Sequence, residues 1–183
     1  MKMQKNLKIA AAAVAVLWLV FFINHVTAID LRLYGLRPRH LEGLLGILLA
    51  PFLHVDVAHL IANSGAFFVL LTVSLWFSRR LAIKALLIII VMGGGLVWLL
   101  GGSNTVHVGA SGVIFGLIGF LMFLGAFRRE WTALVISAAV LLLYGGALQT
   151  LLIYMPGTSW PGHIFGFISG ALAAWWTRKE RAM

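Results

Sequence analysis

The sequence predicts an all-α membrane protein with six transmembrane helices. Its 183 residues are 62% hydrophobic and 10% charged, whereas a soluble domain is about half apolar and about one quarter charged. Apolar runs of roughly 20 residues, the length that crosses about 30 Å of hydrocarbon, recur along the whole chain. We therefore expect one domain, 1–183. The runs cover 9–29, 57–77, 81–100, 111–127, 132–153 and 161–176.

The first run has an alternative reading as a cleaved signal peptide. Lys2, Lys5 and Lys8 precede it, and Val26-x-Ala28 resembles a cleavage site. Its apolar stretch is rather long for that role, so we expect it to remain as a span. Turn residues and charges separate most of the later runs, as at Ser78-Arg79-Arg80 and Gly101-Gly102-Ser103-Asn104.

The basic residues predict the orientation of the chain. With the N-terminus in the cytoplasm, 11 of the 14 Lys and Arg residues fall on inner segments, which leaves Arg32, Arg37 and Arg39 outside. The positive-inside rule then places both termini in the cytoplasm. The net charge of +9 is thus explained by loops that face anionic lipid, and we expect no nucleic-acid partner. The inner residues are Lys2, Lys5, Lys8, Arg79, Arg80, Lys84, Arg128, Arg129, Arg178, Lys179 and Arg181.

Between the first two runs, segment 30–56 is too long for a tight turn and too apolar for a free loop. Its leucines recur at helical spacing beside charged residues. We expect a helix that lies on the outer surface or dips into it, ended by Pro51. The leucines are Leu41, Leu44, Leu45, Leu48 and Leu49.

Polar residues near the outer ends of the second, fourth and sixth runs share one depth. They are His59 and Asn63, Ser111, and His163. Polar groups inside a membrane are costly and usually face the bundle interior and serve a function. Hydrogen bonds that only join helices are the alternative for His59 and Asn63, which share a helix face.

Ser111 lies in Gly109-Ala110-Ser111-Gly112. A packing motif of small residues is one reading. The other is a nucleophile at a helix start, where unsatisfied N–H groups can bind an oxyanion. The 17 residues from Ser111 to Phe127 span only about 25 Å at 1.5 Å per residue, which places Ser111 below the outer surface.

His163 lies in Gly162-His163-x2-Gly166-x3-Gly170, whose small residues form a groove for a neighbouring helix. The smooth edge of Gly112 and Gly116 fits that groove, and this packing would bring Ser111 and His163 together. A serine beside an imidazole base is an activated nucleophile. Because no Asp or Glu is placed to complete a triad, we expect a Ser–His dyad, with His59, Asn63 and the Ser111 N–H stabilising the oxyanion.

These motifs, together with His54-x4-His59-x3-Asn63, resemble the rhomboid family of intramembrane serine proteases in its six-span bacterial form. The resemblance covers nearly the whole chain. It implies a rhomboid-like bundle in a bacterial inner membrane, with 30–56 as a membrane-embedded first loop and 153–160 in the cap over the site. The first-loop Trp-Arg pair of some members is missing.

The resemblance also implies roles for single residues. Ser111 would be the nucleophile, His163 the base and later acid, and Gly109 part of the substrate-lining loop. Phe115 replaces a frequent Tyr that packs on the catalytic imidazole, and we expect the phenyl ring to stack in the same way. Substrates would be single-span proteins that unwind locally. We expect no cofactor and no metal, and the sequence indicates no oligomeric state.

Three other readings stay open. A rhomboid-like pseudoprotease would bind membrane helices without cutting them. A small transporter is disfavoured because no internal repeat is evident. A metal site is disfavoured because no His-Glu-x-x-His motif occurs and the chain has no cysteine; its ligands would be His54, Asp56, His59, His107 and His163. We expect His25, His40 and His107 near the outer surface without a role.

Overall fold

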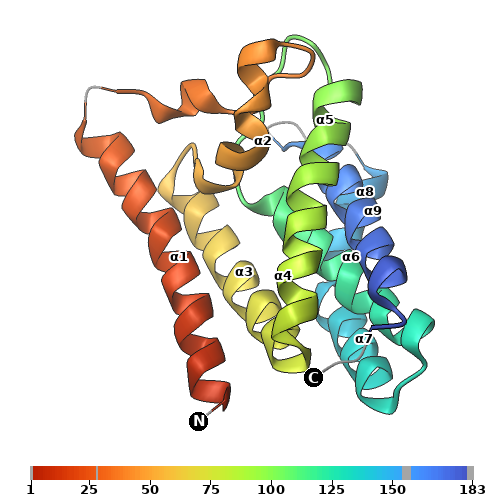
Figure 1. The fold of residues 1–183 in the computed structure, drawn as a ribbon. Helices are drawn as coiled ribbons and strands as arrows, with labels where there is room; N and C mark the ends of the chain where they lie inside the picture. Colours follow the sequence, from red (N-terminus) through yellow and green to blue (C-terminus); the bar gives the residue numbers. More distant parts are fainter. Residues whose placement is uncertain (1, 28, 154–157, 181–183) are drawn as a thin grey trace.

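The computed structural model describes residues 2–27, 29–153 and 158–180, and these form a helical bundle (Figure 1). Within this part of the chain the extended pairing is a single antiparallel bridge, between Leu36 and His107. The α-helices are α1 (Lys2–Val26), α2 (Gly46–Leu49), α3 (Val57–Phe77), α4 (Arg79–Ile88), α5 (Gly94–Leu100), α6 (Ser111–Arg128), α7 (Trp131–Tyr144), α8 (Gln149–Leu152) and α9 (Trp160–Thr177). The π-helical turn η4 (Ile89–Gly93) joins α4 to α5, and the 3₁₀ turn η5 (Gly145–Leu148) joins α7 to α8.

In the described part of the chain, five helical stretches are long and apolar enough to cross a membrane. They are Lys2–Val26, Val57–Phe77, Arg79–Leu100, Ser111–Arg128 and Trp131–Leu152, and they agree with the first five predicted spans. The sixth predicted span corresponds to α9, which has 18 residues but carries His163, Ser169 and several glycines that lower its hydropathy. The six-span count therefore stays a prediction.

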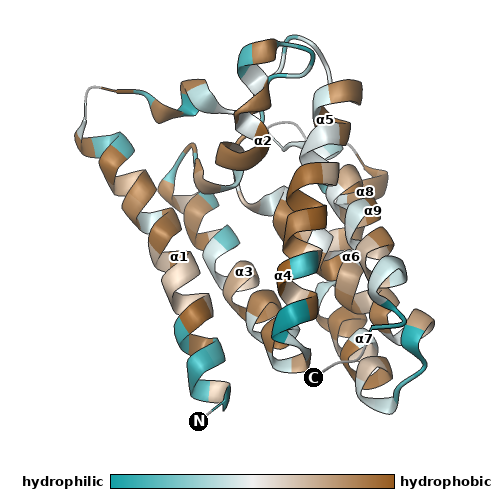
Figure 2. Cartoon of the chain, in the orientation of Figure 1, coloured by the Kyte–Doolittle hydropathy of each residue, from teal (hydrophilic) through white to brown (hydrophobic). Residues whose placement is uncertain are grey.

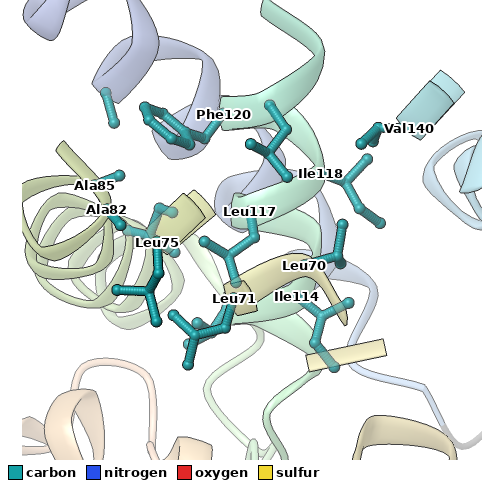
Figure 3. Close-up of a cluster of buried hydrophobic side chains, with 14 of the residues drawn as sticks. Leu70, Leu71, Leu75, Ala82, Ala85, Ile114, Leu117, Ile118, Phe120 and Val140 are labelled. Carbon is teal, nitrogen blue, oxygen red and sulfur yellow. The ribbon is translucent and has the colours of Figure 1, made fainter. Parts of the chain in front are cut away.

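Helix α6 forms the centre of the bundle. In the 18-residue stretch of α6 that would cross the membrane, 61% of the residues are buried inside the protein, against 11% in the corresponding stretch of α1. Leu117, Ile118 and Phe120 of α6 are fully buried, and Figure 3 shows them among leucines of α3 and alanines of α4. The helix that begins with Ser111 therefore has the largest buried share of the five apolar helical stretches among the described residues.

The closest helix–helix contact, between α6 and α9, is made by glycines. A Cβ on Gly166 would collide with the Gly112 carbonyl, and a Cβ on Gly170 would collide with the Gly116 carbonyl. Only residues without side chains let two backbones approach so closely. The predicted packing of the Gly112–Gly116 edge against the Gly166–Gly170 groove is confirmed.

Basic residues gather at the end of the bundle opposite the first loop, where α1 begins and α9 ends (Figure 1, Figure 2). Arg128 donates to the carbonyls of Thr177 at 3.2 Å and Glu180 at 2.8 Å. Lys84 pairs with Glu180 at 2.6 Å, and the hydrogen bond from Lys84 is the main reason that the pKa of the Glu180 carboxyl lies below its usual value. Segments far apart in sequence are therefore tied together at this end.

The leucine-rich part of segment 30–56 forms the predicted helix, and Pro51 lies in its last turn. Residues Leu41–Phe52 make one continuous apolar helical stretch, which consists of η2 (Leu41–Leu44), α2 and η3 (Ala50–Phe52), with the separate turn η1 (Leu31–Tyr34) before it. Gly43 and Gly46 press directly on the backbone of residues 35–37, so this stretch packs closely on the earlier part of the loop. All five leucines are exposed.

Candidate active site

One cavity of about 850 Å³ joins the starts of α3, α6 and α9. Its lining includes His59, Asn63, Ser111 and His163, the polar residues that the sequence singled out at one depth. Phe115 lines it as well. Figure 1 shows α6 beginning inside the bundle, below the level at which α5 ends. The polar groups of three helices thus converge on one hollow.

Ser111 is the first residue of α6 and is partly exposed. The first N–H groups of an α-helix have no intrahelical partner, so the start of α6 presents donors beside the serine hydroxyl. The preceding Gly109 has φ +112°, a left-handed conformation that glycine adopts without strain. Its N–H donates to the carbonyl of Ala50 at 2.8 Å, which fixes the approach to Ser111 against the first loop.

His59 and Asn63 stand directly against Gly109. A Cβ at position 109 would lie 2.6 Å from His59 Cε1 and 3.6 Å from Asn63 Nδ2. The Nδ2 atom of Asn63 is buried and has no hydrogen-bond partner among the described residues. A buried donor without a partner costs free energy, so this amide offers a hydrogen bond to a group that enters the cavity.

The start of α3 holds His59 in place. Asp56 is the N-cap of α3, and its carboxylate accepts the His59 N–H at 2.7 Å. The buried ring of His54 meets the His59 ring edge-on, with the ring centres 5.1 Å apart. Asp56 lines the cavity as well, and its carboxylate caps the start of α3 by accepting the His59 N–H.

His163 lies in the first turn of α9 and is buried. Its ring stacks on Phe115, with centroids 4.2 Å apart and planes 16° from parallel. The stacking that we expected of a phenyl ring at this position is therefore present. Phe115 follows Ser111 by one helical turn, so a single face of α6 carries both residues.

Thr150 of α8 is a polar neighbour of His163 that sequence reasoning missed. Its hydroxyl donates to the carbonyl of Ala147 at 2.8 Å, and its oxygen lies 3.4 Å from His163 Nδ1. A hydroxyl already engaged as a donor can only accept from that nitrogen. The only sequence feature that could have pointed to Thr150 is its place as a polar residue near the outer end of the fifth predicted span.

His107 is a second polar residue of the cavity to which the sequence assigned no role. We expected it in a loop near the outer surface, and the structure places it between α5 and α6, where it is 9% exposed and lines the cavity. Its ring contacts Thr105 and Ser159 at hydrogen-bond distance. Burial lowers the pKa of His107 below its usual value, which favours the neutral ring.

Two further expectations concern this region. Among the described residues no three His, Asp or Glu side chains lie close enough together to hold a metal ion. Of the predicted cap segment 153–160, residues 154–157 lie outside the described residues.

Comparison with known proteins identifies the family. The sequence pattern of the Rhomboid domain matches residues 42–180. The chain belongs to the rhomboid family. This family consists generally of intramembrane serine proteases. Together with the five apolar helical stretches found among the described residues, the match shows that the chain is an integral membrane protein.

Relatives of this rhomboid protein match it over most of their length. An uncharacterised protein of Mycobacterium tuberculosis is 38% identical over 182 residues, which cover 93% of this chain and 76% of that protein. An uncharacterised protein of Mycobacterium leprae is 38% identical over 184 residues, covering 92% and 72%. A Bacillus subtilis protein named "Putative rhomboid protease YdcA" is 30% identical over 177 residues, covering 91% and 86%.

Proposed function

We propose that this rhomboid protein is an intramembrane serine endopeptidase that cleaves transmembrane segments of single-span proteins with a Ser111–His163 dyad. The observation that carries the proposal is the cavity of about 850 Å³. It gathers a serine at a helix start, a histidine stacked on an aromatic ring, and a buried amide donor without a partner. Those are the parts that acyl transfer needs.

In the proposed mechanism, His163 takes the proton of the Ser111 hydroxyl while Oγ bonds to the carbonyl carbon of the substrate. Thr150 supports this role, because a hydroxyl that accepts from Nδ1–H leaves the lone pair on Nε2. His163 then gives the proton to the amine as the C–N bond breaks. A water molecule, deprotonated by His163, attacks the acyl group and frees Ser111.

The negative charge on the carbonyl oxygen requires donors at the start of α6. Asn63 Nδ2 is one, since it stands 3.6 Å from the Cβ position of Gly109 and lacks a partner among the described residues. His59 and the Ser111 N–H are the others. Donors that are already in place cost no reorganisation when the charge forms.

Gly109 in its left-handed conformation leaves room for a substrate backbone beside Ser111, because any side chain there would meet the His59 ring. A transmembrane helix hides its carbonyls in its own hydrogen bonds, so the substrate must unwind locally to reach this place. We further propose six spans with both termini in the cytoplasm of a bacterial inner membrane, which directs the cavity to the outer side. The close packing of Gly112, Gly166 and Gly170 then holds α9 against α6.

The test is cleavage by the purified full-length chain in proteoliposomes. A fluorescent single-span protein with a helix-breaking segment would be incubated with wild type, Ser111→Ala, His163→Ala and Ser64→Ala. Ser64 is a matched control, because it is another serine inside a span but bonds Trp18 of α1 at 3.0 Å. We expect cleavage by wild type and Ser64→Ala only. Equal cleavage by all four would refute the dyad, and binding without cleavage by wild type would favour a pseudoprotease.

A further inference from the structure

His107 joins three segments that meet above the cavity. Its backbone pairs with Leu36 of the first loop, through N–H···O bonds of 2.9 and 3.0 Å. Its ring lies between Thr105 and Ser159, with Nε2 2.9 Å from Thr105 Oγ1 and Nδ1 2.7 Å from Ser159 Oγ. Ser159 is the N-cap of α9. One buried side chain therefore bonds the segment that leads into Ser111 to the start of the helix that carries His163.

The hydrogen bonds of Thr105, His107 and Ser159 form a series, and the bonds at its two ends fix which group donates at each step. At one end the Thr105 hydroxyl donates to the Gly102 carbonyl at 2.6 Å, so its oxygen accepts from His107 Nε2–H. At the other end the Gly162 N–H donates to Ser159 Oγ at 3.3 Å, so the Ser159 hydroxyl is free to donate to His107 Nδ1. A neutral ring fits this order, in agreement with its burial. Chained bonds of one direction strengthen each other.

The α6–α9 contact combines close glycine backbones on both helices with ring contacts between Phe115 and His163 and between Phe123 and Phe167. Ser159 ties the first turn of α9 to a third segment. Ser159 precedes His163 by one turn, and its carbonyl accepts the His163 N–H at 3.0 Å. A displacement of Ser159 is therefore passed directly to the backbone of His163.

We propose that the His107–Ser159 hydrogen bond is a positioning clamp, which sets His163 at the distance from Ser111 that proton transfer requires. His107 is in this view a positioning residue, which acts on the reaction through Ser159 and the start of α9. The inference rests on the proposed function, because its readout is the reactivity of Ser111. Misplacement of a base by about 1 Å can lower a rate about a hundredfold.

The test measures the rate at which a fluorophosphonate acylates Ser111, together with kcat and KM for the single-span substrate. His107→Phe keeps the ring volume and removes both hydrogen bonds. His107→Asn keeps an oxygen acceptor close to the position of Nδ1. Ser159→Ala and the double variant His107→Phe/Ser159→Ala complete a cycle. Thr177→Val is the matched control, since Thr177 lies at the opposite end of α9 and its hydroxyl donates within the helix, to the Ala173 carbonyl at 2.8 Å.

We expect His107→Phe to slow acylation and kcat by roughly ten- to a hundredfold, with KM within about twofold. The thermal midpoint should fall modestly, because two buried hydrogen bonds are lost. His107→Asn should restore most of the rate, and the double variant should be no slower than the slower single variant. Full activity of His107→Phe, or losses that multiply in the double variant, would overturn the clamp. If wild type itself is not acylated at Ser111, the proposed function fails, which is a different result from an insensitive His107.

Discussion

The α6–α9 pair and the α1–α3 pair are built in opposite ways. The first pair packs backbone on backbone at Gly112 and Gly166, and α6 is 61% buried in its spanning window. The second pair is joined at the surface by the Trp18–Ser64 hydrogen bond of 3.0 Å, and α1 is 11% buried. An apolar cavity of about 320 Å³ remains between α1, α3 and α4.

The Rhomboid domain match at 42–180 includes the first pair and leaves α1 out. The candidate site thus lies at the end of the more closely packed of the two helix pairs.

The largest effect on stability is expected from placing valine in each of the two interfaces. Gly166→Val places atoms on the Gly112 carbonyl, and overpacking of this kind costs about 1–3 kcal/mol and occasionally more. Ala13→Val points into the cavity beside α1 and should change the free energy of unfolding by less than about 0.5 kcal/mol. Thermal unfolding in detergent measures both. Equal destabilisation would mean that the two interfaces do not differ in packing.

The next effect separates activity from stability on α3. Asn63→Ala removes an oxyanion donor, so kcat should fall roughly a hundredfold to a thousandfold. Because Asn63 Nδ2 is buried without a partner among the described residues, its removal should leave the unfolding midpoint unchanged or raised. Ser64→Ala, one residue further on and directed at α1, should keep full activity. A clear loss of stability in Asn63→Ala would show that the amide serves the fold.

A smaller effect is expected at the aromatic stack. Phe115→Leu removes a ring centred 4.2 Å from the His163 ring, and such pairs contribute about 0.5–1.5 kcal/mol. This amounts to a twofold to tenfold loss in the acylation rate of Ser111. Phe115→Tyr keeps the ring and should stay within about twofold of wild type. If Leu and Tyr behave alike, the stack does not orient the imidazole.

The smallest effect concerns the inner end of α9. The pKa of Glu180 is lowered by Lys84, so the ionised form is favoured in the folded state, and its contribution is complete above the ordinary value of 4.5 and lost as pH falls further. Unfolding midpoints at pH 7 and pH 4 should therefore differ slightly less in Glu180→Gln than in wild type. Glu42→Gln is the control, since Glu42 makes no ion pair among the described residues. An unchanged pH dependence in Glu180→Gln would contradict the ion-pair account.

Features that repeat along the chain were predictable from the sequence. Helical periodicity and span length gave five of the helical stretches, and the glycine spacing gave the α6–α9 packing. His59, Asn63, Ser111 and His163 could be placed at one depth because three helices start on the same side, and the structure has all four lining one cavity. Their catalytic roles stay a prediction.

Contacts between segments distant in sequence were not predictable. Nothing near Gly43 or Gly46 indicates that they press on the backbone of residues 35–37. His107 and Ser159 are 52 residues apart, so their hydrogen bond depends on the completed bundle. Thr150 approaches His163 only because α8 follows the 3₁₀ turn η5. Such contacts depend on tertiary packing, which local periodicity does not encode.

The most direct test of the dyad is covalent labelling of Ser111. A fluorophosphonate reacts with a serine that a base activates and needs no knowledge of the substrate. Wild type, Ser111→Ala and His163→Ala would be incubated in detergent and the modified peptide located by mass spectrometry. We predict a stoichiometric adduct on Ser111 in wild type, none in Ser111→Ala, and a rate at least a hundredfold lower in His163→Ala. Equal labelling of Ser111 with and without His163, or no labelling of folded wild type, would contradict the account.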